Sequence, residues 1–139
     1  QILEAAAGEA DALLLIVAAL STDQLKDYID LARELGIEHL VEASDPRDAE
    51  AALKAGAKVI GVNNRDLSTF DVDVARTEAV LPALAGSGAV VVSESGIADR
   101  DTVVRLERAG VDALLVGEAL VTAADPGALL RALRGLDSP

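Results

Sequence analysis

The chain of 139 residues has no cysteine and almost no aromatic side chains, since Tyr28 and Phe70 are the only two. Without cysteine, disulfides, thiol chemistry and thiolate-bound metal are excluded, which fits a reducing cytoplasm. The single histidine, His39, cannot form a zinc site alone. Hydrophobic residues make up 51% of the chain, so the core must be aliphatic and a disordered protein is excluded.

Positive charge is also scarce, because 12 Lys and Arg residues face 24 Asp and Glu residues, for a net charge of −12. This balance disfavours nucleic acid and anionic membrane surfaces as partners. The longest apolar run, Ala12–Leu20, is too short to span a membrane, and no basic segment precedes it as in a signal peptide. We therefore expect one cytoplasmic domain over residues 1–139.

Five short aliphatic runs lack polar alternation, which is typical of parallel strands covered on both faces. They are Ala12–Ala19, His39–Ala43, Lys58–Val62, Ala89–Ser93 and Ala113–Val116. Apolar residues at helical spacing lie between them, and helix starts and stops are marked by Ser21 with Gln24, Asp45-Pro46, Asp125-Pro126, Gly36, Gly56 and Gly110. A helix followed by five strand–helix units predicts an α/β fold with a parallel sheet.

Two architectures fit five such units, namely an open doubly wound sheet and part of an eight-stranded (β/α)₈ barrel. A complete barrel needs roughly 200–250 residues, so this chain would hold only part of one. The pattern alone favours the open sheet, but the residues at the strand ends favour the barrel.

Polar residues gather where four of the predicted strands end. In parallel α/β folds this edge carries the ligand site. The residues are Glu42, Asn63-Asn64, Glu94-Ser95-Gly96 and Gly117-Glu118. The period of two along a strand puts Glu42, Asn63 and Glu94 each at the end of an apolar face. We expect two carboxylates and an amide to meet in one cavity, where acid and base roles can be divided between the carboxylates.

Several segments, in this order and spacing, resemble indole-3-glycerol phosphate synthase over essentially the whole chain. They are Leu14–Leu20, Leu40-Val41-Glu42, Ile60–Leu67, Val92–Ile97 and Leu115–Leu120. The resemblance implies strands four to eight of a (β/α)₈ barrel and a lyase of tryptophan biosynthesis. That family closes the indole ring of a phosphorylated anilino-deoxyribulose, with loss of carbon dioxide and water and without a metal or cofactor.

The same resemblance implies catalytic roles for Glu42, Asn63 and Glu94. It also implies that Ser95, Gly96, Gly117 and Glu118 bind the substrate and its phosphate. The family's catalytic lysines belong to the first and third strands, which would precede residue 1. None of the three lysines of this chain follows a predicted strand. We therefore expect an incomplete site and an inactive isolated fragment.

Two further groups are expected to be structural. Arg65 and Asp66 are adjacent and oppositely charged, so we expect them to form a local ion pair that ties the loop after the third strand of this chain. His39 begins a strand, far from the edge that carries the site, and predicts a structural or surface side chain.

Other interpretations remain open. The chain could be a noncatalytic natural or engineered fragment that forms an open sheet or a dimer. It could also pair with the missing N-terminal half, because open sheet edges and apolar surface favour association. Another phosphate-binding barrel of the tryptophan or histidine pathways is disfavoured by the motifs around Asn63 and Glu94. A receiver-like signalling domain is also disfavoured, because this chain lacks the acidic cluster that such a domain carries at its first strand.

Overall fold

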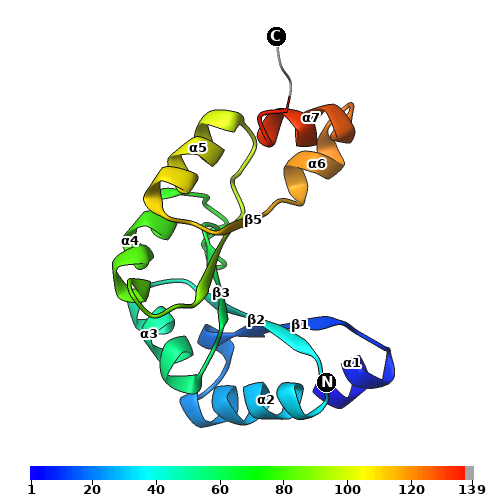
Figure 1. Ribbon diagram of the computed structural model, residues 1–139, viewed down its shortest axis with the longest axis vertical. Coiled ribbons are helices and arrows are strands. Elements are labelled where there is room, and N and C mark those ends of the chain that lie inside the picture. Colours follow the sequence, from blue (N-terminus) through cyan, green and yellow to red (C-terminus); the bar gives the residue numbers. More distant parts are fainter. Residues whose placement is uncertain (137–139) are drawn as a thin grey trace.

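A computed structural model describes residues 1–136 as one parallel sheet with helices along it (Figure 1). The last three residues of the expected domain, 137–139, lie outside the described residues. The elements are α1 (Ile2–Ala7), β1 (Ala12–Ile16), the 3₁₀ helix η1 (Val17–Ala19), α2 (Thr22–Glu34), β2 (Glu38–Ala43), α3 (Pro46–Ala55), β3 (Val59–Asn63), α4 (Ala75–Leu84), β4 (Val90–Glu94), α5 (Arg100–Ala109), β5 (Ala113–Leu115), α6 (Glu118–Thr122) and α7 (Pro126–Leu133).

The five strands are parallel and lie in chain order, β1-β2-β3-β4-β5. Figure 1 shows them along the inner side of an open arc, with α2, α3, α4 and α5 on the outer side. Strand–helix alternation with all connecting helices on one side is the arrangement of a (β/α)₈ barrel wall. The predicted partial α/β barrel is therefore confirmed.

Local sequence signals place most helix ends correctly. Ser21 and Gln24 form a reciprocal capping box, and Asp45 and Asp125 cap helices that begin at a proline. Gly56 and Gly110 end α3 and α5 with positive φ angles of 92° and 100°, which favour glycine. These predicted boundaries are confirmed.

One predicted boundary needs correction. The aliphatic run Ala12–Ala19 is a strand only to Ile16, after which the chain turns into η1. The alternation of strands and helices predicts a helix between β3 and β4; α4 is that helix, with Val80 and Leu84 buried one turn apart and Pro82 inside it. An uninterrupted apolar run contains no signal for the point at which a strand becomes a helical turn.

The hydrophobic core lies between the sheet and the outer helices. Leu25 and Ile29 of α2 pack with Val41 and Ile60 of the sheet, and all four are almost completely buried. The inner side of the sheet is less covered, since Leu14 and Leu115 are each 48% exposed there. The two faces of one sheet therefore have different surroundings, and polar side chains on them have different neighbours.

No helix among the described residues is long and apolar enough to cross a membrane.

Candidate functional site

Strand register brings the three predicted catalytic residues to one face of the sheet. Glu42 on β2 lies opposite Gly61 on β3, and Asn63 on β3 lies opposite Glu94 on β4. Because side chains alternate along a strand, all three point to the inner side of the arc. The two carboxyl groups and the amide therefore share one face as predicted, and their place in a cavity stays a prediction.

Asn63 is hydrogen-bonded to one of the two carboxyl groups, that of Glu42. Its Nδ2 donates a hydrogen bond of 3.2 Å to Oε2 of Glu42, and its Oδ1 accepts one of 3.0 Å from the backbone N–H of Arg65. The second bond fixes which end of the amide faces Glu42. Asn63, Glu42 and Glu94 are all buried, although two of them are ionisable.

Burial changes the proton affinity of both carboxyl groups. Burial, and then the charge of Glu42, raises the pKa of Glu94 to about 7. Burial also raises the pKa of Glu42, while the hydrogen bond from Asn63 opposes that shift. Oε1 of Glu94 has no hydrogen-bond partner among the described residues. The site therefore combines a carboxyl group that holds its proton near neutral pH with a second, amide-bound carboxyl group.

The four predicted phosphate-binding residues follow β4 and β5. Ser95 and Gly96 have positive φ angles of 68° and 75°, and Gly117 precedes the short helix α6 without a side-chain cap. An added Cβ at Gly96 would lie 2.4 Å from Cγ1 of Val72, so glycine there also admits the loop after β3. The carboxylate of Glu118 forms an ion pair with Arg65. A role in phosphate binding stays a prediction for all four residues.

The predicted ion pair between Arg65 and Asp66 is wrong. Arg65 reaches across to Glu118 after β5, whereas Asp66 pairs with Arg76 of α4 at 2.7 Å. Hydrogen bonds from Ser68 and from Arg76 hold the pKa of Asp66 well below its usual range. Neighbours in sequence point apart here, and each ties the loop after β3 to a different element.

A buried polar cluster on the other face of the sheet was not predicted. Asn64 donates from Nδ2 to Oγ of Ser93 and to the carbonyl of Ser95, at 3.0 Å each. Its Oδ1 accepts from the N–H and the hydroxyl of Thr77, at 3.2 and 2.8 Å. The only sequence signal is that Asn64 follows Asn63 and therefore faces the helices, where a buried amide needs partners.

His39 is buried on the helix-facing side of β2, so of the two expected alternatives, structural or surface, it is the structural one. Burial, and then the charge of Arg33, lowers its pKa. It lies at the start of the strand, away from Glu42, so it is not part of the candidate site.

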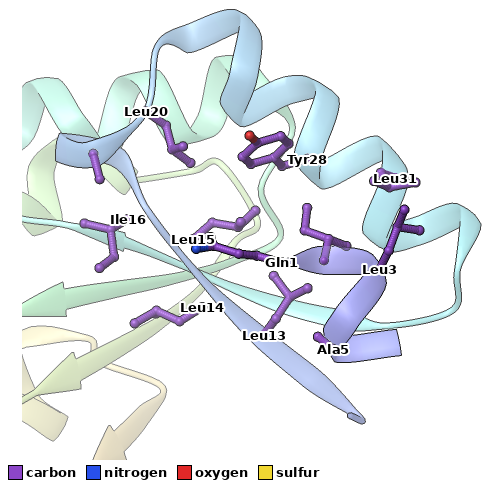
Figure 2. A pocket seen from close by; sticks show the side chains of 12 residues that line it. Gln1, Leu3, Ala5, Leu13, Leu14, Leu15, Ile16, Leu20, Tyr28 and Leu31 are labelled. Atoms are coloured by element: carbon purple, nitrogen blue, oxygen red, sulfur yellow. The ribbon is translucent and has the colours of Figure 1, made fainter. Parts of the chain in front are cut away.

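A separate cavity of about 580 Å³ lies against the edge strand β1, between α1 and α2 (Figure 2). Its lining is aliphatic apart from Gln1 and Tyr28. Its lining differs in chemistry from the acidic cluster, although Ile16 in that lining lies opposite Glu42 in the register of β1 and β2. Within residues 1–136, no group of three or more histidine, aspartate or glutamate side chains is arranged to hold a metal ion.

Sequence comparison identifies close relatives. The family model for indole-3-glycerol phosphate synthase matches residues 1–133. The chain is 48% identical, over 94% of its length, to the indole-3-glycerol phosphate synthase of Laribacter hongkongensis. It is 52% identical, over 97% of its length, to indole-3-glycerol phosphate synthase 2 of Streptomyces coelicolor. These matches cover 49% and 52% of the relatives, so the chain spans about half of their length.

Solved structures share the fold at lower identity. Thiamine phosphate pyrophosphorylase from Pyrococcus furiosus superposes with a TM-score of 0.75 and 20% identity, covering 98% of this chain and 63% of that one. A 3-hexulose-6-phosphate synthase gives 0.72 and 19%, covering 99% and 68%. At such identity the likeness concerns the fold alone.

Proposed function

The chain belongs to the indole-3-glycerol phosphate synthase family, and from that premise we propose that it carries part of the active site of this carbon–carbon lyase. The reaction converts 1-(2-carboxyphenylamino)-1-deoxyribulose 5-phosphate into indole-3-glycerol phosphate, carbon dioxide and water, in tryptophan biosynthesis. Within that reaction the acidic cluster of β2, β3 and β4 would handle protons, and the turns after β4 and β5 would hold the phosphate.

The observation that carries the proposal is the hydrogen bond between Asn63 and Glu42, with Glu94 buried beside them. Ring closure expels an oxygen as water, so protons must be delivered and removed near neutral pH. Glu42 would act as the acid/base carboxylate, oriented by Asn63. Glu94, with a pKa of about 7, would hold a proton where substrate lies against the sheet.

The phosphate would bind to the backbone around Ser95, Gly96, Gly117 and Glu118. Phosphate groups commonly bind in the loops after the last two strands of such barrels, through backbone N–H groups. The ion pair with Arg65 engages the carboxylate of Glu118, which would otherwise repel the phosphate.

This chain alone would not turn over substrate, because the catalytic lysines of the family belong to strands one and three. No metal or organic cofactor would be needed. The compartment would be the cytoplasm, in line with the absence of cysteine.

The test is to fuse the upstream half of the Laribacter hongkongensis relative to the N-terminus of this chain and to follow indole product fluorescence. Tryptophan is absent from the 139 residues, so this part adds no indole background. We expect turnover from the fusion and none from the folded chain alone. In the fusion, Glu42→Gln should slow turnover at least about tenfold, as for loss of an acid/base group.

Glu34→Gln is the matched control, because it makes the same change on the exposed surface of α2. It should leave turnover unaltered. Unchanged turnover of Glu42→Gln would remove Glu42 from the mechanism. Turnover by the chain alone would overturn the assignment of the missing lysines.

A noncatalytic role is the second candidate, supported by the exposed inner face and the edge strands β1 and β5. Leu14 and Leu115 on that face are each 48% exposed, and the aliphatic cavity in Figure 2 lies at the β1 edge. Such surface favours self-association. Light scattering on the purified chain should give at least a dimer, and a monodisperse monomer would contradict this candidate.

A further inference from the structure

We propose that Gly61 is a positioning residue whose missing side chain creates the space in which the Glu94 carboxyl group lies beside Glu42. The inference rests on the proposed function in one respect, since it takes these two carboxyl groups as the proton-handling pair.

The space above Gly61 is filled by the end of the Glu94 side chain. An ideal Cβ at Gly61 would lie 1.7 Å from Oε1 of Glu94 and 2.9 Å from its Cδ. Two non-bonded atoms cannot lie as close as the first of these distances. Any side chain at position 61 would therefore occupy the present place of the Glu94 carboxyl group.

Backbone conformation does not require a glycine at this position. Gly61 is absent from the glycines with positive φ, and it lies in the middle of β3, paired on both sides. Glycine in a strand interior weakens the strand, because it adds flexibility and contributes no packing. Glycine at position 61 is thus explained by the space that its neighbour occupies.

The space above Gly61 lies beside Glu42, so the Glu94 carboxyl group that fills it comes close to the carboxyl group of Glu42. Gly61 lies directly opposite Glu42 on β2 and opposite Val92 on β4, so a side chain folded over Gly61 lies next to Glu42. Among the described residues, Glu42 is the charged group that acts on Glu94. A carboxyl group moved off Gly61 would lose both this neighbour and part of its burial.

Gly61→Ala should therefore move one side chain and leave the fold intact. The atoms that overlap belong to the flexible end of Glu94, which can rotate away. Cδ1 of Leu40 would lie 3.3 Å from the new methyl group and needs to shift only slightly. We expect the displaced Glu94 carboxyl group to reach solvent and to titrate closer to a normal glutamate.

The experiment is a carboxyl ¹³C NMR titration of the full chain labelled at glutamate, with Glu94→Gln used to assign the resonance of Glu94. In Gly61→Ala the titration midpoint of Glu94 should fall by about one pH unit or more. Gly8→Ala is the matched control, because the added Cβ meets only ordinary contacts of 3.4 and 3.5 Å. It should leave the midpoint where it was.

An unchanged Glu94 midpoint in folded Gly61→Ala would overturn the proposal. If Gly61→Ala fails to fold, the double variant Gly61→Ala/Glu94→Ala tests whether the clash is with the Glu94 side chain. Removing that side chain should restore folding. Failure of this rescue would also overturn the proposal.

Turnover of the fused protein separates this inference from the proposed function. A shifted midpoint with unchanged turnover would uphold the role of Gly61 and contradict the catalytic role of Glu94. A shifted midpoint with slowed turnover would support both.

Discussion

Two buried polar clusters lie on opposite faces of strands β3 and β4, and they differ in how completely their atoms are paired. The inner cluster is Glu42, Asn63 and Glu94, and the outer cluster is Asn64, Thr77 and Ser93. The outer cluster is neutral, and both amide atoms of Asn64 have partners. The inner cluster is acidic, and one carboxyl oxygen of Glu94 is unpaired among the described residues.

The difference separates a structural network from a chemical one. Fully paired buried polar groups make a rigid and specific core, whereas a partly paired group keeps the capacity to bind or to exchange a proton. The outer cluster joins the end of β3 to α4 and to the turn after β4, through Asn64, Thr77 and Ser95. It holds in place the turn that adjoins the inner site.

The largest expected effect is on stability when the outer cluster is broken. Asn64→Ala removes four hydrogen bonds and leaves Thr77, Ser93 and the Ser95 carbonyl with fewer partners in a buried site. We expect the free energy of unfolding to fall by about 3 kcal/mol, measured by urea denaturation.

Asn63→Ala is the matched control for this prediction, because it is the same substitution one residue earlier on the other face. It removes two hydrogen bonds. A loss of about 1 kcal/mol is expected. Equal losses for the two variants would remove the distinction between the clusters.

A smaller effect is expected from removing the buried acid of the inner cluster. The pKa of Glu94 is raised to about 7 in the folded chain, above the value of about 4.5 for an ordinary glutamate. Between these values the unfolded chain releases the proton that the folded chain keeps, so Glu94 lowers stability as the pH rises from about 4.5 to 7. Glu94→Gln should remove that loss.

At pH 8 we expect Glu94→Gln to be more stable than the unsubstituted chain by about 1 kcal/mol, a figure reduced for solvent screening. At pH 4.5 the two should be nearly equal. Urea denaturation at both pH values measures this, and Glu34→Gln on exposed α2 reports the general effect of one fewer negative charge. Equal gains in the free energy of unfolding for Glu94→Gln and Glu34→Gln at pH 8 would show that the burial of Glu94 does not lower the stability of the chain.

Short-range signals in the sequence predict much of the fold. The capping box at Ser21 and the helix-ending glycines at 56 and 110 act through bonds within a few residues, so they can be read without a structure. The alternation of strands and helices likewise indicates parallel pairing. The inner placement of Glu42, Asn63 and Glu94 follows from strand parity, because successive side chains point to opposite faces.

Contacts between distant residues could not be predicted in this way. The sequence suggests that Arg65 pairs with its neighbour Asp66, but in the fold Arg65 reaches Glu118, 53 residues away. Asn64 finds its partners on α4 and after β4, and Gly61 is needed for a carboxyl group from β4. These choices depend on strand register and on how side chains share space.

The sequence by itself therefore determined which polar residues lie at the ends of β2, β3 and β4 and which face they occupy, because local hydrogen bonding and the alternation of side chains decide both. Tertiary structure alone decided which buried groups are paired and which are not. Partners for a buried amide or carboxyl group come from other strands and helices, and only packing brings those within about 3 Å.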